Sequence, residues 1–233
     1  RTTVARAEAD FADMNLAQLS RALHLPSLAG HISGHLALRM LPGGGMTLNT
    51  RIHSSDAAYR EYETSHLDAD LRIDVGNDTL RVTIPRAFAR TAYGEFTAAD
   101  GRYQQGMEGV GLLTMALRGE RIPLAMFGDD TEYGGYTTLV GTLSGDPLVP
   151  MLTAAVTVND GMLLGRAFTE GIGKMTYQAG GALRFRDVVL TRPGLRLEMA
   201  GGTDGFDPRD GMVGQEGTLH LQGAPLADVL NIV

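Results

Sequence analysis

The sequence contains no cysteine and no tryptophan, and Lys174 is its only lysine. The absence of cysteine excludes disulfides, thiolate metal sites and cysteine nucleophiles. Aromatic residues make up only 6% of the chain. A carbohydrate-binding surface built on stacked rings is therefore not expected, although Tyr59, Tyr62, Tyr133 and Tyr136 would be the candidates for one.

Clusters of basic residues are also missing. The chain has 20 Lys plus Arg against 27 Asp plus Glu, a formal net charge of −7. Because phosphate neutralisation dominates nucleic-acid binding, this balance disfavours a nucleic-acid partner. No apolar run approaches the roughly 20 residues of a membrane span, and no signal peptide is present.

Glycine, by contrast, is abundant, with 31 of 233 residues. Glycine costs about 1 kcal/mol per helix position relative to alanine, so this content indicates many turns between short strands. The length allows one large β domain or two smaller ones. The chain begins at Arg1 and stops inside an apolar segment, 230–233. We therefore expect it to be a fragment of a longer protein.

Period-two alternation is the clearest pattern in the sequence. In residues 67–75 every odd position is apolar and nearly every even one is charged, which predicts a half-buried strand. Residues 76–78 read as a turn, and 80–84 alternate again. The two segments together predict a β-hairpin.

The same alternation recurs along the chain and predicts an antiparallel meander with one apolar and one wet face. We expect a mainly β fold, an elongated, curved antiparallel sheet forming an open groove, with short connecting helices. The apolar face must pack on a second sheet, close on itself or receive apolar cargo. The residues expected to line it are Leu36, Leu38, Met40, Leu48, Ile52, Leu71, Ile73, Val75, Leu80, Val82, Ile84, Leu113, Met115, Leu183, Phe185, Leu195, Leu197, Met199, Leu219 and Leu221.

Three segments break the alternation and predict short helices: 15–23, 122–127 and 225–230. In the first, Asn15 is the expected N-cap. In the last, Pro225 would occupy the first helical position.

These helices are evenly spaced, and a glycine signature repeats with them, at 28–34 and 139–145. We interpret the chain as two copies of one repeat, 1–120 and 121–233, the second ending in the start of a third.

No catalytic motif is present: there is no Gly-x-Ser-x-Gly elbow, phosphate loop or dinucleotide fingerprint. His31 and His35, with His24 and His53 nearby, could be metal ligands, but polar residues on a solvated face explain them. Residues 204–211 could form a calcium loop, although a hairpin turn explains their Asp, Gly and Pro content better. We expect no enzyme activity, cofactor or metal.

Several segments together resemble the AsmA-like superfamily, and TamB-type translocation and assembly proteins most. They are the short helices at 15–19 and 225–230, the Gly-Thr-Leu-Ser-Gly-Asp-Pro segment at 141–147, and the glycine-bounded strands of 180–223. The resemblance covers nearly the whole chain. The first copy departs from it, because Gly34 is followed by His-Leu and not by Asp-Pro.

The resemblance implies a periplasmic protein of Gram-negative bacteria, anchored in the inner membrane by a segment outside this chain. It implies a β groove that carries phospholipid acyl chains toward the outer membrane. It also implies a role in outer-membrane biogenesis and protein assembly through a β-barrel partner. The alternatives are a structural β repeat of an adhesin or surface protein and a carbohydrate-active β-helix.

Overall fold

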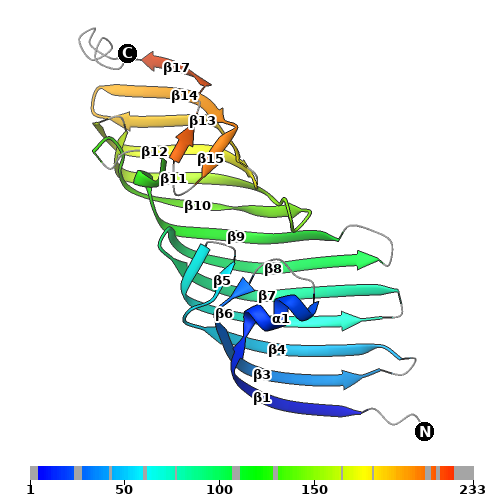
Figure 1. Ribbon diagram of the computed structural model, residues 1–233. Coiled ribbons are helices and arrows are strands. Elements are labelled where there is room, and N and C mark those ends of the chain that lie inside the picture. Colours follow the sequence, from blue (N-terminus) through cyan, green and yellow to red (C-terminus); the bar gives the residue numbers. More distant parts are fainter. Residues whose placement is uncertain are drawn as a thin grey trace. The chain divides into compact units, whose positions relative to one another are not determined.

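The computed structural model describes residues 5–23, 28–41, 44–59, 62–76, 78–106, 111–127, 131–163, 165–179, 181–207, 211–213 and 216–222. Within them the chain is mainly β, with one α-helix and one 3₁₀ turn (Figure 1). The strands pair antiparallel and form a sheet that is not closed. The predicted fold class is thus confirmed.

Two compact units make up the chain: Arg1–Leu117 with Ser144–Pro147, and Arg118–Leu143 with Leu148–Val233. The predicted repeat at 1–120 and 121–233 stays a prediction. The two glycine segments that suggested it have different places in the fold. Residues 28 and 29 form one short strand, Gly30 follows it with a positive φ, and residues 31–34 begin the next strand. Residues 139–145, by contrast, form the end of a single strand.

In the first unit the strands follow the order β1-β3-β4-β6-β7-β8, and β2 pairs with β5, which pairs with β6. The elements are β1 Arg6–Asn15, α1 Leu16–Leu23, β2 Leu28–Ala29, β3 His31–Met40, β4 Met46–Ser54, β5 Ala58–Tyr59, β6 Tyr62–Val75, β7 Thr79–Thr91 and β8 Gly94–Gly106. The predicted hairpin, β6 with β7, is confirmed, and β3 also pairs antiparallel with β4.

In the second unit the order is β11-β12-β13-β14-β17, with β15 and β16 as a separate hairpin. The elements are η1 Leu124–Phe127, β11 Met151–Leu163, β12 Arg166–Gln178, β13 Ala182–Arg192, β14 Leu195–Thr203, β15 Gly205–Asp207, β16 Gly211–Val213 and β17 Glu216–Gln222. β9 Leu112–Pro123 and β10 Gly134–Gly145 have residues in both units.

The first predicted helix is confirmed as α1. The side-chain oxygen of Asn15 accepts a hydrogen bond from the backbone N–H of Gln18 at 3.1 Å, as expected of an N-cap. The second predicted helix is smaller than expected. Residues 122 and 123 belong to β9, and only the four-residue 3₁₀ turn η1 follows. The third, 225–230, lies outside the described residues.

β7 continues past Pro85, beyond the alternating segment 80–84 of the predicted hairpin. Asp70 pairs with Arg86 and Arg72 pairs with Thr83, so Ile84 and Pro85 together face Leu71. This is a β-bulge, one of the few interior strand positions where a residue without an N–H is tolerated.

Aspartates in the left-handed region mark two further bulges. Asp13 has φ 57° beside the register shift in β1, and Asp187 has φ 53° beside the shift in β13. Asp is one of the few residues besides glycine that adopts this backbone conformation at modest cost.

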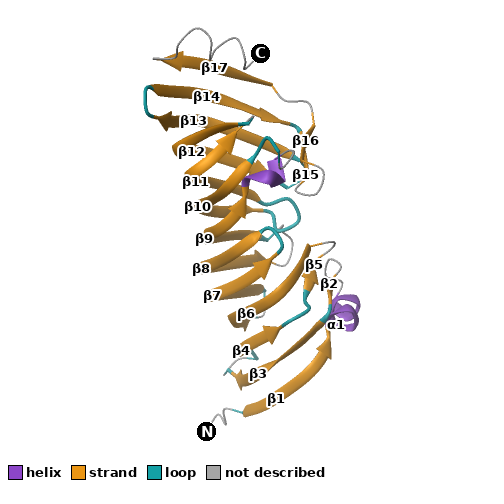
Figure 2. Cartoon of the chain, turned by 90° about the vertical axis from the view of Figure 1, so that its left-hand side faces the viewer, coloured by secondary structure: helices purple, strands orange, loops and turns teal. Residues whose placement is uncertain are grey.

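The core of the first unit gathers at one end of its strands. Leu16, Ile32 and Ala57 are buried there, and the partly buried side chains around them are Phe11, Leu28, Ile52 and Leu67. Figure 2 shows α1 beside β2 and β5 at this end. The helix therefore covers only part of the face to which these side chains point.

Candidate functional site

The strand register of the first unit arranges predicted lining residues in rows. Leu38 lies opposite Leu48, Leu48 opposite Ile73, and Ile73 opposite Val82. A neighbouring row, across the same four strands, consists of Met40, Met46, Val75 and Leu80. Because cross-strand partners project to the same side, β3, β4, β6 and β7 share an apolar surface, which we call the row surface.

The row surface lies outside the packed core of the first unit. The core uses Ile32, Ile52 and Leu67, at the other end of β3, β4 and β6. The side chains of the row surface are half-buried, and Met40 is exposed to 39%. Each still presents apolar area that a further apolar group could cover.

Between the row surface and the core lies a third row with a polar member. Leu36 faces Thr50, and Thr50 faces Leu71. The Thr50 hydroxyl donates to the His35 carbonyl oxygen at 2.9 Å, so it needs no outside partner. Ile84, the last predicted lining residue of β7, lies opposite Gly101, where an added Cβ would lie 2.8 Å from the Ile84 Cβ. Ile84 therefore covers that backbone.

β9 carries two further predicted lining residues. Leu113 and Met115 are half-buried and alternate with exposed neighbours such as Leu112. Alternation alone puts them on one face of their strand.

The apolar face of the second unit is more tightly packed. Leu183 is exposed to only 1%, so it fills the core and does not line an accessible surface. Val158, Phe168 and Leu190 form a buried cluster against which Val188, Leu197 and Met199 also pack, with Leu124 and Leu163.

The other predicted lining residues of this unit are Phe185, Leu195, Leu219 and Leu221. Phe185 and Leu195 are half-buried. The backbone of Leu219 lies opposite Met199 and that of Leu221 opposite Leu197; their side chains are outside the described residues.

The opposite face of the first unit carries ion pairs, both across strands and along β6. Asp70 accepts hydrogen bonds from Arg51 at 2.8 Å and from Arg86 at 3.4 Å. Asp74 accepts from Arg72 at 3.0 Å and from the Thr47 hydroxyl at 2.7 Å. The hydrogen bond from Arg51 lowers the pKa of Asp70, and that from Arg72 lowers the pKa of Asp74. Both carboxyls are therefore ionised at neutral pH.

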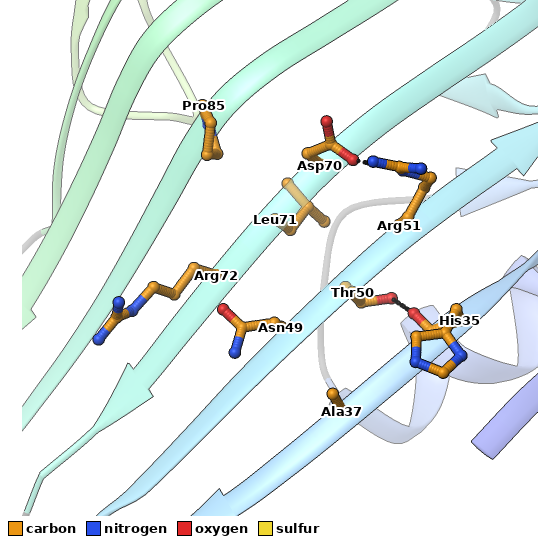
Figure 3. Close-up of a pocket in the computed structure, with 9 residues that line it drawn as sticks. All are labelled: His35, Ala37, Asn49, Thr50, Arg51, Asp70, Leu71, Arg72 and Pro85. Carbon is orange, nitrogen blue, oxygen red and sulfur yellow. Dashed lines mark hydrogen bonds and ion pairs between the residues drawn. The ribbon is translucent and has the colours of Figure 1, made fainter. Parts of the chain in front are cut away.

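A shallow depression of about 510 Å³ opens among these ion pairs (Figure 3). Its lining consists of His35, Ala37, Asn49, Thr50, Arg51, Asp70, Leu71, Arg72 and Pro85. Because Arg51 is paired with Asp70 and Arg72 with Asp74, its positive charges are already matched. The depression therefore has little charge left to attract an anionic ligand.

His31 and His35, considered together in the sequence, do not share a site. His31 Nδ1 lies 2.9 Å from Asp56, and His35 Nδ1 lies 2.9 Å from Asp10. The hydrogen bond between His31 and Asp56 raises the pKa of the histidine and lowers the pKa of the carboxyl. His24 lies outside the described residues.

A different histidine group lies on the polar face, and of its members only His53 was considered in the sequence as a possible ligand. His53 on β4 lies directly opposite Asp68 on β6, and His66 lies two residues before Asp68. Among the described residues these three form the only group of three His, Asp or Glu side chains whose ligand atoms lie close enough together to hold a metal ion. His-x-Asp at 66–68 is visible in the sequence, but the register that brings His53 to it is not.

The suspected calcium loop at 204–211 is built around a hairpin. Gly205 pairs with Val213 and Asp207 with Gly211, and Asp204 forms an ion pair with Arg184. No helix among the described residues is long and apolar enough to cross a membrane.

Comparison of the chain with family models, with curated proteins and with solved structures found no significant match.

Proposed function

We propose that this chain is a β-groove segment of a non-enzymatic periplasmic protein. In this proposal its apolar face holds phospholipid acyl chains on their way between the inner and outer membranes. The observation that carries the proposal is the row surface. Apolar side chains lie in register across four strands and remain half-exposed, away from the core under α1.

The energetics support an acyl chain as the occupant. Each methylene moved from water onto an apolar surface gains about 0.8 kcal/mol, so a dozen gain on the order of 10 kcal/mol. Leu48 and Ile73, at the centre of the row surface, offer aliphatic contacts with no polar group to desolvate. A straight hydrocarbon chain needs only such contacts along its length.

The resemblance to AsmA-like proteins supports the periplasmic location and the phospholipid cargo. It rests on sequence segments, among them the capped helix α1. A role in outer-membrane protein assembly through a β-barrel partner belongs to the same proposal.

One observation favours the structural alternative for the second unit. Leu183 is almost fully buried and Phe168 packs in a core, as expected of a β segment with a purely structural role. We therefore place lipid contact on the first unit.

Site-specific photo-crosslinking tests the proposal. A photoreactive amino acid is placed at Ile73, or in a second variant at Leu48, and the chain is expressed in the periplasm of a Gram-negative host. Irradiation followed by mass spectrometry should recover phospholipid adducts from both positions. Asn49, exposed on the opposite face and adjacent to Leu48, is the matched control.

Adducts at Ile73 and Leu48 but not at Asn49 support the groove. Equal adduct yields on both faces, or no adducts at either, would refute lipid binding by the row surface and leave the structural role.

A further inference from the structure

Three side chains of the polar face meet across β4 and β6. His53 lies opposite Asp68. His66 lies on the same side of β6 as Asp68, because side chains two positions apart on a strand point to the same face. The ligand atoms of the three groups all lie within 4.8 Å of one another. We call these residues the His-Asp-His cluster.

The distances within the cluster are close to those of a metal site. His53 Nδ1 lies 2.9 Å from one oxygen of Asp68, and His66 Nε2 lies 2.5 Å from the other. In a tetrahedral zinc site with metal–ligand distances of about 2.0–2.1 Å, ligand atoms lie about 3.3 Å apart. Separating the carboxylate oxygens from the two ring nitrogens by less than about 1 Å would bring both His–Asp distances to this spacing, and all three ligand atoms already lie within 4.8 Å of one another.

The donor set selects the kind of metal. Two imidazoles and one carboxylate suit zinc and related divalent transition metals, whereas calcium and magnesium prefer oxygen ligands. All three side chains are partly exposed, which leaves a fourth position for water.

Neighbouring groups hold the rings without competing for the ion. The His66 ring packs edge-on against Phe88, with centroids 5.6 Å apart, and against His53 at 5.1 Å. Arg90, opposite His66 on β7, donates to Glu95 at 3.0 Å, so its charge is matched by a carboxylate outside the cluster.

The other two His–Asp pairs of this unit show what is particular to the cluster. His35 with Asp10 has the same 2.9 Å separation as His53 with Asp68, as has His31 with Asp56. Neither belongs to a group of three metal-ligating side chains among the described residues. They are therefore internal controls with the same pairwise chemistry and one ligand fewer.

We propose that His53, His66 and Asp68 bind a divalent transition-metal ion of the zinc class, with water as the fourth ligand. The ion ties β4 to β6 near the end of β4, from which the chain continues to β5. The cluster lies on the polar face, so this site does not depend on lipid binding by the row surface.

The test is titration of the whole chain, without a histidine tag, with Zn²⁺ by calorimetry and with Co²⁺ by visible absorption. One strong site is expected, with Co²⁺ bands typical of four or five ligands. His53→Gln and His66→Gln should each weaken binding at least tenfold. His35→Gln should leave it unchanged.

Thermal melting supplies a second readout. Zn²⁺ should raise the melting temperature of the wild-type chain and of His35→Gln, but not of His66→Gln, because only a ligand bound to the folded state stabilises it. If His53→Gln alone fails to fold, metal binding by His66→Gln decides whether the proposal holds. No binding in the micromolar range, or binding that survives both cluster substitutions, would overturn the proposal.

Discussion

Phe168 on β12 lies directly opposite Gly161 on β11, and its ring occupies the space that a side chain at position 161 would need. A Cβ added at Gly161 would lie 2.3 Å from the Phe168 Cζ. The ring thus covers a bare stretch of backbone and joins the buried cluster with Val158 and Leu190. A glycine and an aromatic residue act here as one packing unit.

Gly161→Ala should therefore destabilise the second unit by about 1–3 kcal/mol through overpacking. Denaturant unfolding measures the change. Gly134→Ala is the control, because its added methyl would meet only the flexible side chain of Met162 at 3.3 Å or more. Equal effects of the two substitutions would contradict the packing role of Phe168.

The two apolar faces should respond differently to a charge. Leu183→Asp places a carboxylate where the side chain is only 1% exposed, and we expect a loss of at least about 3 kcal/mol. Leu48→Asp, on the half-exposed row surface, should cost less than about 2 kcal/mol because its carboxylate stays partly hydrated. Thermal melting of both variants, beside Asn49→Asp, measures the difference. A Leu48→Asp protein that does not fold would show that the row surface is core.

The His31–Asp56 pair makes stability depend on pH in a defined window. The pKa of Asp56 is lowered from its ordinary 3.8, so its contribution is present above that value and is lost as pH falls through the lowered pKa. The pKa of His31 is raised from 6.5, so its contribution is complete below 6.5 and is lost as pH rises through the raised pKa. The pair therefore stabilises most between these limits.

His31→Gln should accordingly lower the melting temperature more at about pH 5 than at about pH 9. The measurement is the difference between wild type and variant at each pH, which cancels the effects of the other titrating groups. The same loss at both pH values would show that the ion pair contributes nothing.

Asp160 adopts the left-handed conformation, with φ 51°, inside β11. A β-branched residue is strained there, so Asp160→Val should cost about 1–3 kcal/mol. Asp160→Gly should be neutral or slightly stabilising. Asn159→Val, at the exposed neighbouring position, is the control for adding an apolar residue. Urea unfolding of the three variants provides the comparison, and equal stabilities would contradict backbone strain at this site.

Alternation in the sequence was sufficient to predict the β6–β7 hairpin, because a half-buried strand must place apolar residues on every second position. It did not predict that β7 runs on to Thr91. Pro85 has no N–H to donate to a neighbouring strand, so it is tolerated inside β7 only because it lies in a β-bulge. The bulge depends on the pairing with the neighbouring strand.

The candidate site was predictable in part for the same reason. Which residues share a face follows from period two, so the sequence predicts one face for Leu38, Leu48, Ile73 and Val82, whereas their alignment in a single row depends on register. Their exposure was not predictable, because it depends on where α1 packs. The contact between His53 and His66 depends on register and on turn length, which a single sequence does not specify.

The Ile84–Pro85 pair facing Leu71 also has a consequence for how such a chain can change over evolutionary time. A strand lacking Pro85 would alternate without interruption, with Val82 and Ile84 on the same side as Ala87 and Ala89. A one-residue insertion into a strand ordinarily reverses the orientation of every residue after it. At this position the insertion is absorbed locally, so Ala87 still pairs with Ala69 and Ala89 with Leu67. Homologous chains that differ by one residue here would keep the same two faces.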